Sequence, residues 1–156
     1  MVQSAANLSY GTQSQICEVL NQCVAETVIT TMLAQNFHWN VTGMAFGPLH
    51  ELFQKIYEDH FKAQDDLAER IKALGGHANG QISEMVSASK VEEHNGKCSA
   101  EEMIKVLASA QRTVANTLAG AASVAEKQDD LLTQDLCIQR GRVHDKFAWL
   151  LSANIV

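Results

Sequence analysis

Apolar residues recur along most of the chain at spacings of three and four, the pattern of α-helices that bury one face. The first such stripe predicts a helix over residues 13–39, and Thr12 and Gln15 have the spacing of a capping box at its start. We expect its apolar residues to face a common core: Ile16, Leu20, Cys23, Val24, Val28 and Phe37.

A second stripe begins near Pro48, a residue suited to a first helical turn, and continues to Leu74. The pair Gly75-Gly76 follows at once and predicts a helix stop, because glycine accepts the left-handed conformation that ends many helices. Gly43 breaks the chain between the two predicted helices.

Residues 75–98 are polar and carry several turn signals, with a short helical turn predicted around Glu84–Lys90. Ser99 and Glu102 then form a second capping box, which opens a helix that ends near Lys127. The polar stretch is therefore a long crossover between two pairs of helices.

Asp129 or Asp130 can cap a last helix, whose apolar stripe is Leu132, Leu136, Val143, Phe147 and Leu150. No alternating strand pattern and no internal repeat occurs. Residues 1–156 are thus predicted to form one all-α domain, with residues 1–12 a short tail that carries no basic residue. Its four-helix bundle with one long crossover is similar in connectivity to ferritin-like bundles.

Composition and charge further narrow the class of protein to which the chain can belong. Hydrophobic residues make up 46% of the chain and charged residues 19%, as in globular proteins. We find no apolar run of about 18 residues and no secretory signal, so the sequence predicts a cytoplasmic location. The net charge is −6, and all twelve Lys and Arg residues lie from Lys55 onward. The first part of the chain therefore has no basic arm for DNA.

The four cysteines, Cys17, Cys23, Cys98 and Cys137, include no CxxC pair, which argues against a structural zinc site or a thioredoxin-like motif. Cys17 and Cys23 lie about 240° apart around one helix and cannot pair within it. We interpret them as reduced core residues.

Four side chains on the first two predicted helices are candidate metal ligands. His38 ends the first helix and His50 begins the second, so the turn between them can bring the imidazoles together. Asp65 and Glu69 lie one helical turn apart on one face of the second helix. Imidazole and carboxylate suit iron, zinc or manganese. No histidine follows a glutamate by three residues, so the Glu-x-x-His di-iron centre of a bundle interior is not predicted.

The two halves of this ligand set cannot meet within one chain, because the helix between His50 and Asp65 separates them by about 22 Å. Two such helices packed antiparallel about a two-fold axis near Tyr57–Glu58 would bring the histidines of one subunit to the carboxylates of the other. One isologous interface would then make the site twice.

The chain strongly resembles the Dps proteins, the mini-ferritins of starved cells, in three runs and in the order of its elements. The runs are HWNVTGMAFGPLH at His38–His50, DDLAERI at Asp65–Ile71 and DKFAWLL at Asp145–Leu151. The resemblance covers nearly the whole chain, and the spacing of its histidines and carboxylates is a specific signature.

The resemblance implies a dodecameric hollow shell with ferroxidase centres between subunits. There Fe²⁺ would be oxidised, preferentially by hydrogen peroxide, and stored as ferric mineral, which protects against oxidative damage. The implied catalytic ligands are His38, His50, Asp65 and Glu69. The family often has an aspartate where Gln54 stands, and an amide is a weaker, neutral ligand that can act through a bridging water.

Three more residues have two interpretations each. Trp39 matches a position near the family's centre where an oxidisable ring could intercept radicals, and it is otherwise a packing residue. Aspartates near the start of the last helix line three-fold pores for iron in the family, so Asp130 and Asp135 are candidates for that role. As single residues they are a helix cap and an exposed carboxylate.

The sequence leaves two other functions open. One is a nucleoid-compacting DNA-binding protein with weak or absent ferroxidase activity, which gel retardation at low salt would detect. The other is a structural assembly with a decayed metal site, which metal titration would separate from a ferroxidase.

Overall fold

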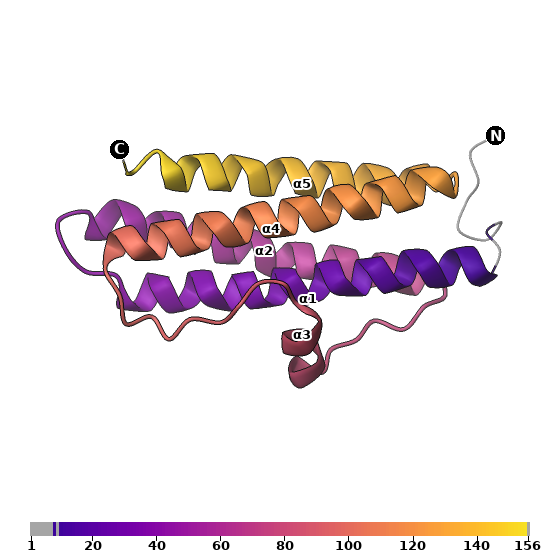
Figure 1. Cartoon of the computed structure of the whole chain (residues 1–156), viewed down its shortest axis with the longest axis horizontal. Helices are drawn as coiled ribbons and strands as arrows, with labels where there is room; N and C mark the ends of the chain where they lie inside the picture. The colour runs from indigo at the N-terminus through magenta and orange to yellow at the C-terminus, as the bar shows by residue number, and fades with distance from the viewer. Residues whose placement is uncertain (1–7, 9, 156) are drawn as a thin grey trace.

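Four long helices lie side by side along one axis, and a short helix sits outside them (Figure 1). The computed structural model describes residue 8 and residues 10–155. The helices are α1 (Tyr10–Asn40), α2 (Phe46–Ala73), α3 (Ile82–Ala88), α4 (Ala100–Lys127) and α5 (Leu131–Ser152), and the described residues contain no strand. The predicted four-helix bundle, with a short helix inside its long crossover, is confirmed.

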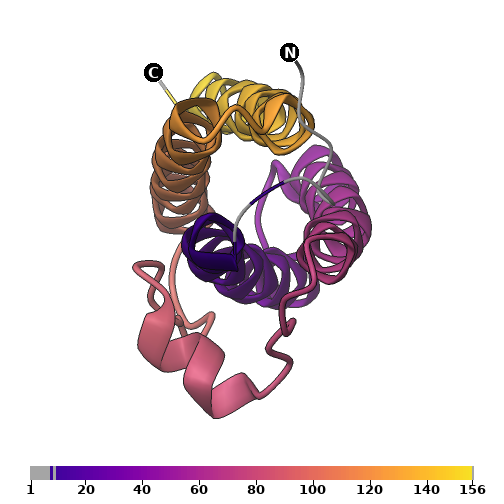
Figure 2. The same ribbon diagram turned by 90° about the vertical axis from the view of Figure 1, so that its right-hand side faces the viewer.

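The four long helices surround a common core when the molecule is viewed end-on, and the crossover with α3 runs along the outer side of α1 (Figure 2). α1 packs against α2 and α4, and α4 packs against α5. The largest fully buried side chains lie on the first three long helices or at their ends: Phe37, Phe53, Ile16, Leu20, Leu49, Ile56, Leu67, Ile71, Leu74, Met103, Leu107 and Leu118.

The stripe predicted for α5 lies about one position from the centre of the buried face: Leu136 and Phe147 pack against the core but are only partly buried. Leu132 is 55% exposed. The buried residues of this helix are instead Thr133, Cys137, His144, Ala148 and Leu151. Because this buried face includes a threonine and a histidine, hydrophobicity alone did not identify it.

Helix α2 ends in a Schellman motif, which confirms the predicted glycine stop. Gly75 adopts φ +81°, and the amides of Gly75 and Gly76 donate to the carbonyls of Lys72 and Ile71 at 3.0 Å. A Cβ on Gly76 would lie 2.5 Å from Cys17 Sγ, so α1 can approach this turn closely only because glycine stands there.

The other helix ends show which capping predictions hold. Ser99 Oγ accepts a hydrogen bond from the Glu102 amide at 3.1 Å, as predicted. Asp130, and not Asp129, caps α5 through its bond from the Thr133 amide. Side-chain acceptors of this kind satisfy amides that the first helical turn leaves without a partner.

The start of the first helix was predicted too late. α1 begins at Tyr10, so position 12 lies inside the helix. The expected tail at residues 1–12 therefore ends before Tyr10, and its residues 1–7 and 9 lie outside the described residues.

Polar side chains of α1 hold the crossover in place. Asn21, Glu26 and Asn36 each hydrogen-bond to the backbone of the crossover. A Cβ on Gly96 would lie 2.5 Å from Asn36 Oδ1, so this anchor also depends on a glycine. The crossover therefore has a defined path over α1, beside the exposed face of α2.

Helix α1 is more apolar than the sequence pattern indicated. Its segment Gln13–Asn40 is long and apolar enough to cross a membrane by length and composition, but 61% of the apolar window is buried in the bundle. Cys17, Cys23 and Cys137 are free and buried, and Cys98 is half-buried. The interpretation of Cys17 and Cys23 as reduced core residues is confirmed.

Candidate metal centre

His38 and His50 form a reciprocal pair at the junction of α1 and α2. The Nδ1–H of each ring donates to the backbone carbonyl of the other residue, at 2.8 Å from His38 and 2.7 Å from His50. The rings stack with centroids 3.6 Å apart and planes 16° apart. A neutral imidazole that donates from Nδ1 keeps the lone pair of Nε2, so both residues retain a nitrogen ready to bind a metal ion.

Aromatic rings hold this pair on both sides. The ring of Phe46 stacks on His50 with centroids 4.9 Å apart, and Tyr57 meets His38 edge-on at 5.2 Å. His38 is buried and His50 is half-buried, so the pair lies at the edge of the core with access to solvent. Trp39 follows directly in sequence but is 60% exposed.

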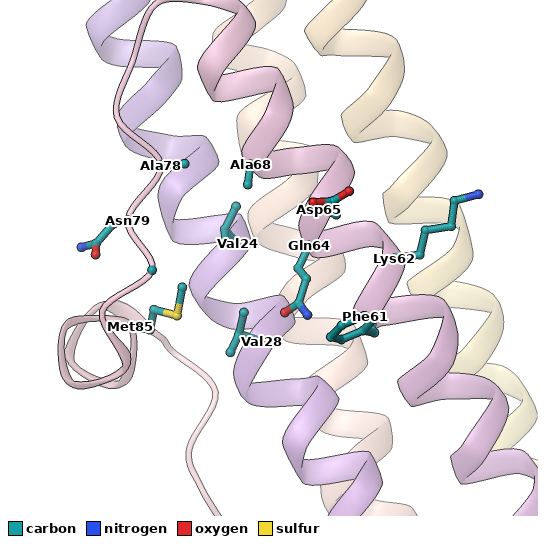
Figure 3. A pocket seen from close by; sticks show the side chains of 11 residues that line it. Val24, Val28, Phe61, Lys62, Gln64, Asp65, Ala68, Ala78, Asn79 and Met85 are labelled. Carbon is teal, nitrogen blue, oxygen red and sulfur yellow. The ribbon is translucent and has the colours of Figure 1, made fainter.

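Asp65 and Glu69 lie further along α2, and both are exposed. Asp65 lines an open groove of about 710 Å³ between α1, α2 and the crossover (Figure 3). The rest of its lining is mostly apolar and includes Val28, Phe61 and Met85. A carboxylate at the edge of an apolar groove is available to a ligand or to another protein surface.

The described part of the chain contains no group of three or more His, Cys, Asp and Glu side chains arranged to hold a metal ion. The histidine pair is held by its own hydrogen bonds, and the two exposed carboxylates lie further along α2. Each pair is therefore one half of the predicted ligand set.

Gln54 lies between the two halves on α2 and is half-buried. Its Nε2 donates to Glu58 Oε1 at 2.7 Å. This bond orients the amide, and its oxygen remains available as a neutral acceptor for a metal ion or a bridging water.

The two aspartates proposed for an iron pore differ sharply in the structure. Asp130 is fully buried, where its carboxylate accepts from Arg70 Nη2 at 2.9 Å and from the Thr133 hydroxyl. A side chain without exposed surface cannot line a pore, so that role is wrong for Asp130 in this conformation. Asp135 is exposed, with a bond from Gln139 Nε2, and stays a pore candidate.

A second polar cluster, to which the sequence pattern assigned no role, lies inside the bundle at His60 and His144. A signal for His60 was present, because Ile56, His60, Ala63 and Leu67 continue the apolar stripe at helical spacing. A histidine on such a stripe is directed into the core.

Four helices joined by a long crossover, with histidine and carboxylate half-sites on the first two, define a ferritin-like protein. The family model described as a ferritin-like domain matches residues 17–156. The DNA protection during starvation protein 2 of Bacillus anthracis is 32% identical over 139 residues, which cover 89% of this chain and 95% of that protein. The chain belongs to the Dps family of ferritin-like proteins.

Solved structures agree with this assignment. The Dps protein of Bacillus brevis has a TM-score of 0.90 at 30% identity, over 94% of this chain and 99% of that chain. The Dps protein of Vibrio cholerae has a TM-score of 0.91 at 25% identity, over 98% and 96%, and is described as a member of a broad superfamily of ferritin-like diiron-carboxylate proteins. Membership of this family supports a mini-ferritin role.

Proposed function

We propose that this protein is a ferroxidase that oxidises Fe²⁺ at centres shared by two subunits and stores the ferric product in a dodecameric shell. One subunit supplies His38 and His50, and the other supplies Asp65 and Glu69. The reciprocal histidine pair carries the proposal, because its hydrogen bonds leave two adjacent Nε2 atoms free to bind metal.

A two-fold dimer is the arrangement that completes the ligand set. Packed antiparallel about an axis near Tyr57–Glu58, two α2 helices place each histidine pair beside a carboxylate pair from the other chain. The groove beside Asp65 supports this arrangement, because its apolar lining includes Phe61, which is 68% exposed in the isolated chain. A second subunit would remove this apolar surface from water.

The ligand set suits the chemistry of iron oxidation. Carboxylates stabilise Fe³⁺ more than Fe²⁺, since the added charge strengthens their attraction, and neutral imidazoles hold the incoming Fe²⁺. Two Fe²⁺ ions each give one electron to hydrogen peroxide, which takes up two protons and leaves as two water molecules. No hydroxyl radical is released in this two-electron step, so iron and peroxide are removed together.

Complementation between two inactive variants tests the shared centre. His38→Ala and Asp65→Ala should each abolish iron oxidation when assembled alone. In a mixed dimer both defects fall on the same centre and the other centre is intact. Random pairing of dissociated subunits should therefore restore about one quarter of the wild-type rate.

The control is Asp66→Ala, which removes an exposed carboxylate next to Asp65 and should leave iron oxidation unchanged. Mixed dimers confirmed by mass spectrometry that remain inactive would refute the shared centre. Full activity of either variant alone would show that its residue is not a ligand.

A further inference from the structure

Three buried side chains from three helices meet inside the bundle. Gln111 on α4 lies between His60 on α2 and His144 on α5, and all three are 0% exposed. Gln111 Oε1 lies 3.0 Å from His60 Nε2 and 2.7 Å from His144 Nδ1. The two rings are 4.4 Å apart between centroids, so the imidazoles and the amide form one connected group.

An ion pair borders this group on one side. Arg140 donates to Asp59 Oδ2 at 2.7 Å, and the same carboxylate oxygen lies 2.9 Å from His60 Nδ1. Among the described residues, Asp59 on α2 and Arg140 on α5 are the charged groups that act on the two imidazoles. Their charges cancel, so a proton added to either ring leaves a net charge inside the bundle.

The hydrogen bonds of the cluster depend on the protonation of His60. Asp59 is ionised, because bonds from His60 and Arg140 hold the pKa of this carboxyl low although burial opposes them. Neutral His60 must therefore donate Nδ1–H to Asp59, which leaves a lone pair on Nε2. That lone pair needs a donor, and Gln111 supplies one only when its amide nitrogen faces the rings.

Protonated His60 requires the opposite orientation of the amide. It donates from both ring nitrogens, to Asp59 and to Gln111 Oε1, while His144 donates its Nδ1–H to the same oxygen. The structure has this orientation of the amide, which leaves Gln111 Nε2 and His144 Nε2 buried without a partner. The two states of the cluster thus differ by one proton and by a half-turn of the Gln111 amide. In neither state does every buried polar atom have a hydrogen-bond partner.

We propose that His60, Gln111 and His144 form an acid-sensitive switch, in which proton uptake turns the Gln111 amide, places a net charge in the core and lowers the stability of the folded bundle. Incompletely paired polar groups in a core are costly, and a buried net charge adds to that cost. The switch would make the bundle less stable when the surroundings become acidic.

The direction of the effect follows from the pKa values. Burial lowers the pKa of His60, with Arg140 adding to this and Asp59 opposing it. Burial, then the charges on His60 and Arg140, lower the pKa of His144 well below its usual value. Both rings are therefore neutral in the folded protein at neutral pH, whereas an unfolded chain takes up protons below about pH 6.5. The stabilising contribution is complete above that pH and is lost as the pH falls further.

The test measures the pH dependence of denaturant unfolding for the intact assembly at fixed protein concentration. Each buried histidine should raise the unfolding equilibrium constant about tenfold for every pH unit below about 6.5, until its folded pKa is reached. His144→Asn keeps a donor near the position of Nδ1 but cannot titrate. For each pH unit below about 6.5, the unfolding equilibrium constant of this variant should therefore rise about tenfold less than that of the wild type.

The matched control is His77→Asn, which changes an exposed histidine and should leave the wild-type slope unaltered. Curves for wild type and His144→Asn that run parallel at all pH values would overturn the proposal, because a purely structural role shifts stability equally at every pH.

Gln111→Glu provides a second, independent variant. A carboxylate accepts but cannot donate, so it should hold His60 in the protonated form at neutral pH. This variant should be less stable than the wild type at pH 7.5 and lose little further stability towards pH 5.5. An unchanged slope in this variant would also contradict the switch.

Discussion

At the scale of single residues, the pair His38 and His50 shows how backbone carbonyls can orient imidazoles that are candidate metal ligands. Each imidazole of His38 and His50 uses its Nδ1–H to close the junction between α1 and α2, and this choice of donor leaves Nε2 free. The hydrogen bonds that stabilise the junction therefore also set the tautomer that the ligand role requires.

Removing the imidazole of His50 should weaken iron binding strongly but lower the stability of the fold only slightly. His50→Ala should weaken anaerobic Fe²⁺ binding, measured by calorimetry, at least about a hundredfold. The free energy of unfolding should fall by only about 1 kcal/mol, because one half-buried hydrogen bond is lost. His77→Ala, at an exposed histidine of the crossover, should change neither quantity. Wild-type iron affinity in His50→Ala would place the site elsewhere.

Asp130 and Asp135 should respond differently to the same substitution. Asp130→Ala removes a helix cap and leaves the Arg70 guanidinium without its ion-pair partner, so the free energy of unfolding should fall by about 3 kcal/mol. Asp135→Ala should change stability by less than about 0.5 kcal/mol but slow iron uptake at low salt. Denaturant unfolding and stopped-flow iron uptake measure the two effects. Equal uptake rates for Asp135→Ala and wild type would exclude the pore role.

At the scale of elements, helix ends are specified by short local signals. The Schellman motif after α2 uses Gly75 in the left-handed region, and Ser99 and Asp130 cap α4 and α5 with their own side chains. Each of these ends was predictable because its physical cause lies within a few residues of sequence. Helix faces are specified less locally, as the buried Thr133 and His144 of α5 show.

Two glycine substitutions should have opposite effects on stability. Gly75→Ala forces a Cβ into the left-handed region and should lower the free energy of unfolding by about 1 kcal/mol. Gly120→Ala lies inside α4, where an added Cβ meets no atom within 4 Å, and should raise it by about 0.5–1 kcal/mol. Urea unfolding measures both. A destabilised Gly120→Ala protein would indicate that this exposed face of α4 is covered in the assembly.

At the scale of the whole molecule, exposed apolar side chains mark the surfaces that a single subunit leaves uncovered. Phe61 lines the groove beside Asp65 and is mostly exposed, as are Leu132 and Trp149 on α5. A two-fold interface over the groove would join the two half-sites as it buries this surface, so assembly and iron oxidation should depend on each other.

Disrupting the groove should therefore abolish activity without unfolding the subunit. Phe61→Glu places a charge in the proposed interface, and light scattering should show dissociated subunits with unchanged helical circular dichroism. Iron oxidation should be lost although all four proposed ligands remain. Asn116→Glu, at an exposed position on α4, is the control and should keep wild-type assembly and activity. Active, dissociated Phe61→Glu subunits would refute a centre shared between chains.

Sequence alone determined the helices and most of their ends, because helical periodicity and capping act over a few residues. It also suggested the four proposed ligands, through their residue types, their spacing and the resemblance to the Dps proteins. The tertiary structure decided which polar residues meet. It brought His38 to His50 across a turn, placed Asp130 against Arg70 in the interior, and joined His60 to His144 through Gln111. Spacing along a helix shows which residues share a face. Only the packing of one helix on another determines what that face contacts, and therefore whether a polar side chain is a ligand, a cap or part of the core.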